Sequence, residues 1–290
     1  MMARKRGGGH KAQVLRDDGE RLSPEEEARL TAELESYVSS DADYEYFAED
    51  EDAGDVLPPP TFEDVIYALE AWKDDGRADQ LHTTQGVDRR YIGVAPAGLD
   101  DLVAMWRGSM DVEARVDLAR ALWDSDIFEA RLVATRLLFQ ARLRPDDVAW
   151  AMIQGWIFQM DCPALTEAVC KTAAKRVQAD AARLDQLELW FDAADDTIRS
   201  AAFRVTLPWA KLRNLKDDDI AVQDRILGWV VTFGAEAGPA LRLSMSQWLR
   251  AYLRHAPERG TAWAQGQVDA LAPGVRREIA RLLNIELTPS

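Results

Sequence analysis

The chain has 290 residues and a formal net charge of −15, so it is long enough for one large domain or two small ones. Its two cysteines and three histidines show no spacing typical of a zinc site, and neither a metal nor another cofactor is expected. The longest apolar runs, such as ILGWVVTFGA, have about half the length of a membrane span, so no membrane-spanning segment is expected.

The start of the chain and the cysteines bear on its location. No apolar segment follows the basic start MMARKRGGGHK, which therefore does not resemble a signal peptide. Cys162 and Cys170 lie in one predicted helix, roughly two turns or about 12 Å apart, which is too far for a disulfide. Two free thiols in a chain of this length favour the cytoplasm.

Residues 1–60 are predicted to form an acidic, largely disordered N-terminal extension. They hold 7 Lys and Arg against 16 Asp and Glu, a charge of −9, whereas residues 61–290 carry −6. Within the extension, SPEEEARLTAELESYV predicts one short helix over residues 24–38, with a serine N-cap and a proline at the first position. The mild acidity of residues 61–290 weighs against strong, non-specific binding to nucleic acid.

The second half of the extension is acidic and ends in three prolines, which is typical of a linker. Its aromatic residues Tyr44, Tyr46 and Phe47 leave two interpretations open. They form a motif that binds a partner, or they belong to a solvated tail, and the second is the more common case for such a charge run.

After residue 60 the apolar residues follow a helical period. In residues 130–141 and 149–160 they are spaced i, i+3, i+4, i+7, i+8 and i+11, which predicts amphipathic helices with one buried stripe each. No segment alternates as a strand does. Helix pairs are predicted to begin near 112, 146, 183 and 217, about 35 residues apart, as in helical-hairpin repeats. The sequence therefore predicts an all-α, right-handed solenoid with a concave face for an extended partner.

Several segments resemble the AlkD-like family of DNA alkylation repair proteins. VDRRYIGVAPAGLDDLVAMW is similar to the family's Tyr-x-Gly entry into a helix, and ALWDSDIFEARLVATRLL is similar to its LW-S-x-x-x-E-x-R helix pair. DRILGWVV and WLRAYLRHAP resemble its penultimate hairpin. The resemblance covers residues 62–284 and implies one HEAT-like helical-repeat domain over residues 61–290, with double-stranded DNA carrying alkylated bases as the partner.

The resemblance also implies a chemistry. Family members that are glycosylases remove N3- or N7-alkylated purines, with an aspartate that stabilises the positive charge developing on the sugar. Glu167 stands at that aspartate's position and is the candidate catalytic residue. Pro163 and Gln247 stand where the family has aromatic residues that pack on the deoxyribose. Trp248, next to Gln247, and Trp190 are the remaining candidates for packing on a base or sugar.

Candidate phosphate contacts follow partly from the resemblance and partly from charge patterning. Arg250 matches a family arginine, and Arg199 lies one residue before another, at a position taken here by Ser200. The others share basic helix faces, since cations that recur every three or four residues lie on one side of a helix. The full set is Lys171, Lys175, Arg176, Arg199, Arg250 and Arg254.

Glu167 also has an interpretation without catalysis. Lys171 follows it by four residues, and a Glu-to-Lys pair at that spacing stabilises a helix surface, as does a carboxylate near a helix start. The competing hypothesis is therefore a non-catalytic HEAT-repeat interaction scaffold that holds a protein partner in its concave face. The missing aromatics favour the scaffold, and the extent of the resemblance favours alkylpurine N-glycosylase chemistry. In either case we expect a monomer.

Overall fold

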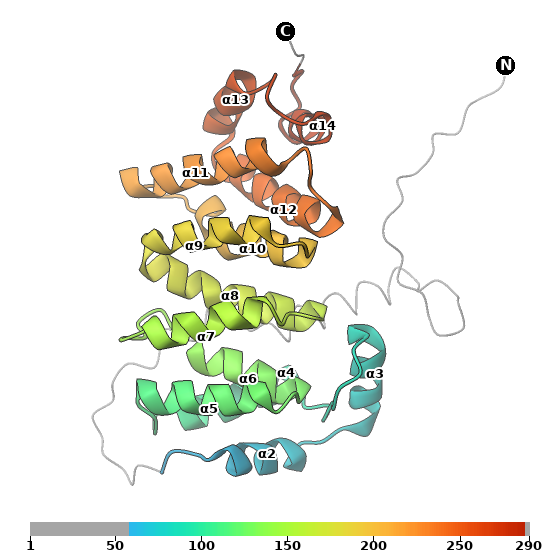
Figure 1. The fold of residues 1–290 in the computed structure, drawn as a ribbon, viewed down its shortest axis with the longest axis vertical. Coiled ribbons are helices and arrows are strands. Elements are labelled where there is room, and N and C mark those ends of the chain that lie inside the picture. Colours follow the sequence, from blue (N-terminus) through green and yellow to red (C-terminus); the bar gives the residue numbers. More distant parts are fainter. Residues whose placement is uncertain (1–57, 288–290) are drawn as a thin grey trace, which may run out of the picture.

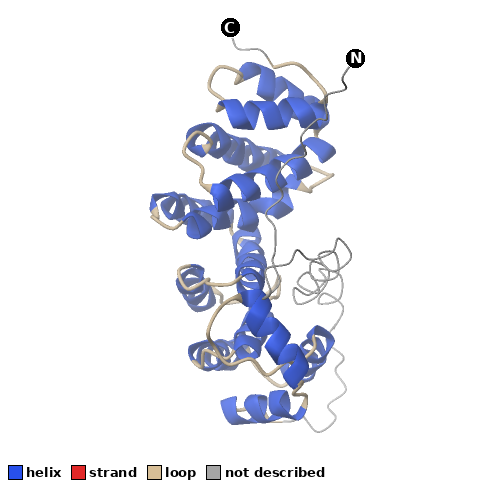
Figure 2. Ribbon diagram, turned by 90° about the vertical axis from the view of Figure 1, so that its right-hand side faces the viewer, coloured by secondary structure: helices blue, strands red, loops and turns tan. Residues whose placement is uncertain are grey.

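The computed structural model describes residues 58–287, and in this part of the chain every regular element is a helix (Figures 1 and 2). A single isolated bridge joins Arg90 to Ile127. The all-α prediction is confirmed for these residues, while the helix predicted over 24–38 lies outside them, and the division of the chain near residue 60 stays a prediction. The helices are α2 (Phe62–Ala71), α3 (Asp75–Gln85), α4 (Pro96–Arg107), α5 (Val112–Asp124), α6 (Phe128–Leu138), α7 (Asp147–Ile157), α8 (Pro163–Ala179), η1 (Ala181–Arg183), α9 (Leu184–Glu188), η2 (Leu189–Asp192), α10 (Asp196–Ala210), α11 (Asp217–Phe233), α12 (Pro239–His255), α13 (Pro257–Gly266) and α14 (Pro273–Leu283).

The helices stack in two layers along the long axis of the molecule (Figure 1). One layer consists of α4, α6, α8, α10, α12 and α14, each packed against the next, and α5, α7, α11 and α13 pack against them from the other layer. The predicted hairpin starts agree with the observed ones to within two residues, since α5 begins at Val112, α7 at Asp147, η1 at Ala181 and α11 at Asp217. This arrangement is a helical-repeat solenoid.

Helices of the first layer bury more residues than the single apolar stripe that the sequence predicts for each helix. Of the residues of α6, only Arg131 is not buried. The helix contacts α4, α5 and α8, so neighbours cover it on several sides. A solenoid buries a helix of the inner layer against its own hairpin partner and against the preceding and following repeats.

Polar side chains join successive hairpins at a constant spacing. Donor and acceptor lie 36 or 37 residues apart, one repeat along the chain, so they occupy equivalent positions in neighbouring repeats. We call this set the inter-repeat ladder. Among its pairs are Trp123 with Gln159, Arg136 with Asp100, Trp150 with Gln186, Arg183 with Asp146, and Arg225 with Glu188.

The most distinctive sequence motifs meet at one buried carboxylate. Glu129 is fully buried and accepts hydrogen bonds from the backbone N–H groups of Ile92 (2.9 Å) and Gly93 (2.7 Å). Burial raises the pKa of Glu129, and the backbone hydrogen bonds oppose that rise. Gly93 has φ 88°, and a Cβ there would lie 2.0 Å from the carbonyl oxygen of Asp74. The glycine of the Tyr-x-Gly motif and the glutamate of the following helix pair therefore serve one structural contact.

Two further expectations can be compared with the described residues. Cys162 and Cys170 are buried free thiols. None of the described helices is both long and apolar enough to cross a membrane.

Candidate nucleic-acid interface

A groove of about 980 Å³ lies across the face formed by α8, α10 and α12. We call it the basic groove. Of the described residues, those that line it include one carboxylate and four cations, together with apolar side chains and Gln178 and Gln247. Its charged residues are Glu167, Lys171, Lys175, Arg204 and Lys211.

The helical period explains how these side chains reach the groove. On α8, Leu165, Val169 and Val177 are fully buried in the core. Glu167, Lys171 and Lys175 follow one another at intervals of four residues, so they share the opposite side of the helix. Arg204 of α10 and Lys211, the residue directly after that helix, lie seven residues apart, about two turns, and both line the groove. The sequence predicts one basic helix face from Lys171, Lys175 and Arg176; Lys171 and Lys175 line the groove, whereas Arg176 is buried away from it.

Glu167 is paired with two of the four cations. Its Oε2 lies 3.5 Å from Nη1 of Arg204, and its Oε1 lies 4.0 Å from Nζ of Lys171. Lys175 places its ammonium group 5.0 Å from the ring centroid of Phe139. Among residues 58–287, no Asp or Glu forms an ion pair with Lys175 or Lys211. The groove therefore has an excess of positive charge that the described carboxylates leave unneutralised.

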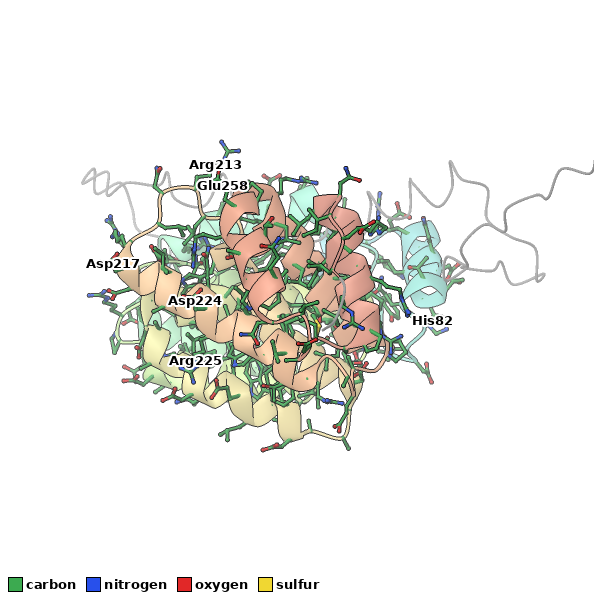
Figure 3. The ribbon with its side chains drawn as sticks, turned by 90° about the horizontal axis from the view of Figure 1, so that it is seen from above. His82, Arg213, Asp217, Asp224, Arg225 and Glu258 are labelled. Carbon is green, nitrogen blue, oxygen red and sulfur yellow. The ribbon has the colours of Figure 1, made fainter. Side chains whose placement is uncertain are left out.

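In the opposite layer, arginines at the surface form ion pairs with carboxylates. Seen along the long axis, Asp217, Asp224 and Arg225 project from α11, and His82 of α3 lies at the opposite edge of the molecule (Figure 3). Arg225 contacts Glu188 at 2.8 Å, and Arg259 contacts Asp224 at 2.9 Å. These cations already have carboxylate partners, which reduces their availability for a phosphate.

The two tryptophans proposed to pack on a base or sugar are corrected by the structure. Trp248 is fully buried, donates its indole N–H to the carbonyl oxygen of Thr206 (3.1 Å) and stacks on Tyr252. Trp190 is 2% exposed and packs beside Trp150. Both are core residues, because the apolar indole ring lies between neighbouring repeats. In their place, Gln247 is exposed and lines the groove.

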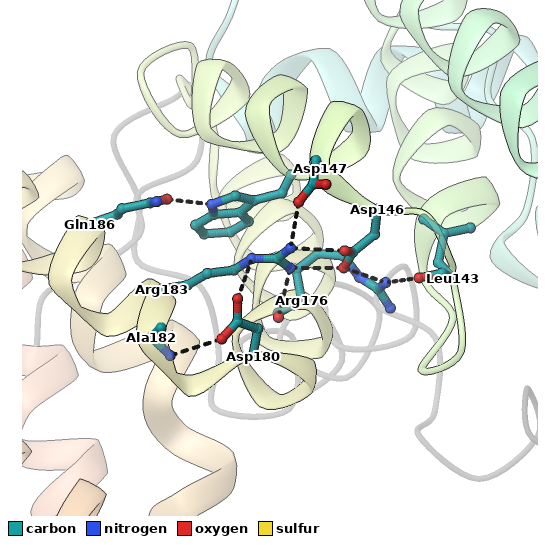
Figure 4. A network of polar contacts seen from close by, with 9 residues as sticks. Leu143, Asp146, Asp147, Arg176, Asp180, Ala182, Arg183 and Gln186 are labelled. Atoms are coloured by element: carbon teal, nitrogen blue, oxygen red, sulfur yellow. Dashed lines mark hydrogen bonds and ion pairs between the residues drawn. The ribbon is translucent and has the colours of Figure 1, made fainter.

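Arg176 is also corrected as a phosphate contact. It is fully buried, and its guanidinium group donates to the carbonyl oxygen of Leu143 (3.1 Å) and to Asp146 (3.0 Å). Figure 4 shows this polar network, in which Asp146 also accepts two hydrogen bonds from Arg183 at 2.8 Å each. The side chain therefore ties α8 to the loop before α7 instead of facing the groove.

The remaining candidate arginines lie outside the groove lining. Arg250 is exposed and lies 3.5 Å from Glu278 of α14, and Arg254 is exposed near the end of α12. Arg199 is partly buried, 3.9 Å from Asp196. The structure thus brings Glu167, Lys171 and Lys175 together and does not add these three arginines to them, although each stays a candidate for a contact elsewhere on DNA.

A family model for DNA alkylation repair enzymes matches residues 65–283, which is most of the chain. The chain belongs to this family. The resemblance to AlkD-like proteins is therefore confirmed at the level of family and fold. No curated protein matches the chain.

Two solved structures share the fold of this family member. One, with a TM-score of 0.55 and 16% identity, covers 80% of this chain and 87% of its own; it represents a family of proteins related to the HEAT-like repeat DNA glycosylases with affinity for branched DNA structures. The other is a predicted DNA alkylation repair enzyme from Enterococcus faecalis, with a TM-score of 0.56, 16% identity, and coverage of 72% of this chain and 95% of its own. At this identity the likeness shows the fold.

Sequence reasoning missed two cations of the groove in this family member. Arg204 lies 37 residues after Glu167, the spacing of the inter-repeat ladder, so the repeat period could have identified it as a neighbour of Glu167. Lys211 follows Arg204 by seven residues, about two helical turns, and caps the end of α10 on the side of the groove. The spacings of 37 and seven residues can both be read from the sequence, but only an alignment of the repeats shows that they place these cations in one groove with Glu167.

Proposed function

We propose that this member of the family holds the sugar-phosphate backbone of DNA in the basic groove and does not excise alkylated bases. The observation that carries the proposal is the excess of positive charge there, with Lys175 and Lys211 free of carboxylate partners among the described residues. Lysine and arginine contacts to phosphates supply most of the affinity of DNA-binding proteins.

The branched-DNA affinity of a structural relative suggests the form of the ligand. Residues 61–290 carry a net charge of −6, so their overall charge repels DNA at long range and binding depends on local contacts in the groove. A DNA branch presents phosphates of more than one helix at close range. We therefore include branched DNA, beside linear duplex, as the ligand to be measured.

Glu167 is the reason for excluding excision. A catalytic carboxylate must offer its negative charge to the cationic sugar in the transition state. Here that charge is shared between Arg204 and Lys171, at 3.5 and 4.0 Å. Pro163 and Gln247, the groove-lining residues that replace the family's aromatics, offer no ring to pack on the deoxyribose.

Reversing one groove cation tests the binding site. Lys175→Glu is expected to weaken binding of both linear and branched DNA at least tenfold, because it removes a phosphate contact and adds a repulsive charge. Fluorescence anisotropy at several salt concentrations should show a smaller salt dependence, by about one unit of slope. Lys73→Glu, the same change on an exposed lysine between α2 and α3, is the control. Equal losses in both variants would mean that only the overall charge matters.

Neutralising Glu167 separates the two hypotheses for this residue. Glu167→Gln is expected to raise the affinity for DNA several-fold, because it removes the acidic residue that lines the groove and frees Arg204 and Lys171 for phosphates. A catalytic role predicts unchanged affinity and a loss of 7-methylguanine release from methylated duplex DNA. Glu258→Gln, in the first turn of α13, is the control. Measurable release by the wild type that Glu167→Gln abolishes would restore the glycosylase hypothesis.

A further inference from the structure

The acidic segment before α2 has a composition unlike the rest of the chain. Residues 41–55, DADYEYFAEDEDAGD, contain eight Asp and Glu and no Lys or Arg. They also contain Tyr44, Tyr46 and Phe47, three of the aromatic residues of the extension. A ligand site for this segment would need cations and apolar surface side by side.

The basic groove offers this combination. Lys171, Lys175, Arg204 and Lys211 surround it, and its lining also includes apolar side chains. The larger of these are Phe139, Leu207, Pro208 and Leu212. Linear duplex DNA presents phosphates and sugars to such a groove and leaves the apolar lining unused, whereas an acidic segment with aromatic residues can use both.

We propose that residues 41–52 bind in the basic groove of their own chain and compete there with DNA. The competition rests on the proposed function, that DNA binds in the same groove. The binding of the segment itself does not, because it follows from charge and apolar complementarity within one chain.

The length of the chain allows this contact. The described structure begins at residue 58, just before α2. From α2 the groove is reached through α6 and α8, two or three helix-to-helix steps of about 8–10 Å each, or about 20–30 Å. An extended chain covers about 3.3–3.6 Å per residue, so about six to nine residues suffice. Residues 41–49 lie at least nine positions before residue 58 and residues 50–52 lie six to eight before it, so the segment is within reach. The tether gives the segment a local concentration near the millimolar range.

Zero-length cross-linking of the full chain without DNA tests the contact directly. A carbodiimide activates a carboxylate and joins it by an amide bond to a lysine that lies in direct contact with it, without a spacer, and mass spectrometry then identifies the linked residues. We expect links from residues 41–52 to Lys171, Lys175 or Lys211. Lys73 and Lys216 are the internal controls, since neither lines the groove. Absence of groove links, or equal labelling of the control lysines, would overturn the proposal.

DNA affinity tests the competition. In the full chain, changing the seven acidic residues of 41–52 to Asn or Gln is expected to raise the affinity for DNA at least tenfold. The matched control changes seven acidic residues between 17 and 33, which alters the net charge equally. A similar gain in both variants would show a general charge effect and would count against competition in the groove.

A peptide in trans completes the test. The peptide of residues 41–52 is added to the variant whose seven acidic residues in 41–52 are changed to Asn or Gln, and it should displace DNA from that variant. A version of the peptide with Tyr44, Tyr46 and Phe47 replaced by serine should displace DNA less. If no variant binds DNA while the groove cross-links form, the proposed function fails and the contact stands. If DNA binds and the cross-links are absent, the proposed function stands and the contact between residues 41–52 and the groove fails.

Discussion

Replacing Glu129 by alanine is expected to lower the free energy of unfolding by about 2 to 6 kcal/mol, because two buried backbone N–H groups lose their acceptor and each such loss costs about 1–3 kcal/mol. The affected groups belong to Ile92 and Gly93, which Glu129 holds at 2.9 and 2.7 Å. A domain is stable by only about 5–15 kcal/mol, so this single change approaches the limit for folding.

Urea unfolding followed by far-UV circular dichroism measures the effect of Glu129→Ala. The control is Glu113→Ala, since Glu113 also lies in the first turn of a helix but is exposed. We expect the control to shift the free energy of unfolding by no more than about 0.5 kcal/mol. Equal midpoints for the two variants would show that the contact between the two motifs does not stabilise the fold.

Asp146→Ala is expected to destabilise the protein by about 3 to 5 kcal/mol, the usual cost of leaving a buried charge without its partner. The side chains of Arg176 and Arg183 are only 0% and 6% exposed, and both form ion pairs with Asp146. Asp147→Ala is the control. The Asp147 side chain is 96% exposed and lies 3.6 Å from Arg183, so its loss should cost at most about 1 kcal/mol.

The contribution of Asp146 also depends on pH. The hydrogen bond from Arg183 lowers the pKa of Asp146 below its ordinary value, with the charges of Arg183 and Arg176 acting in the same direction. The stabilisation is therefore present above the pKa of an unfolded aspartate, about 3.9, and is lost as the pH falls through the lowered folded-state pKa. Wild type and Asp146→Ala should differ most near neutral pH and converge in acid. A difference that is independent of pH would contradict this ion-pair account.

The periodicity of the sequence was sufficient for the fold of residues 58–287, because each hairpin carries its own apolar pattern and its own breaks. The starts of α5, α7 and α11 follow from such local signals. The burial of individual polar or aromatic side chains does not follow from local signals in the sequence. Arg176 is buried because Asp146 and Leu143, about 30 residues away, accept its hydrogen bonds, and no signal near Arg176 in the sequence indicates these partners.

In the candidate site, too, contacts within one helix could be predicted from the sequence and contacts between hairpins could not. Glu167, which the family resemblance singled out, lines the basic groove, and the spacing to Lys171 predicted their pairing. The second partner, Arg204, comes from the next hairpin, and its role depends on the stacking of α10 on α8. Trp248 was expected in the groove because it neighbours Gln247, but adjacent residues on a helix point about 100° apart, and Trp248 faces the core.

The inter-repeat ladder limits how the length of such a chain can change. One residue added within a helix turns every later side chain of that helix by about 100°, which separates donors from acceptors that lie 36 or 37 positions away. A residue added in a loop leaves the partners within each helix in place. An added hairpin that carries the same polar positions keeps every pair, since its arginines donate to the preceding repeat, its tryptophans donate to the following one, and its acceptors meet the corresponding donors. Viable insertions and deletions should therefore fall between helices or comprise whole hairpins.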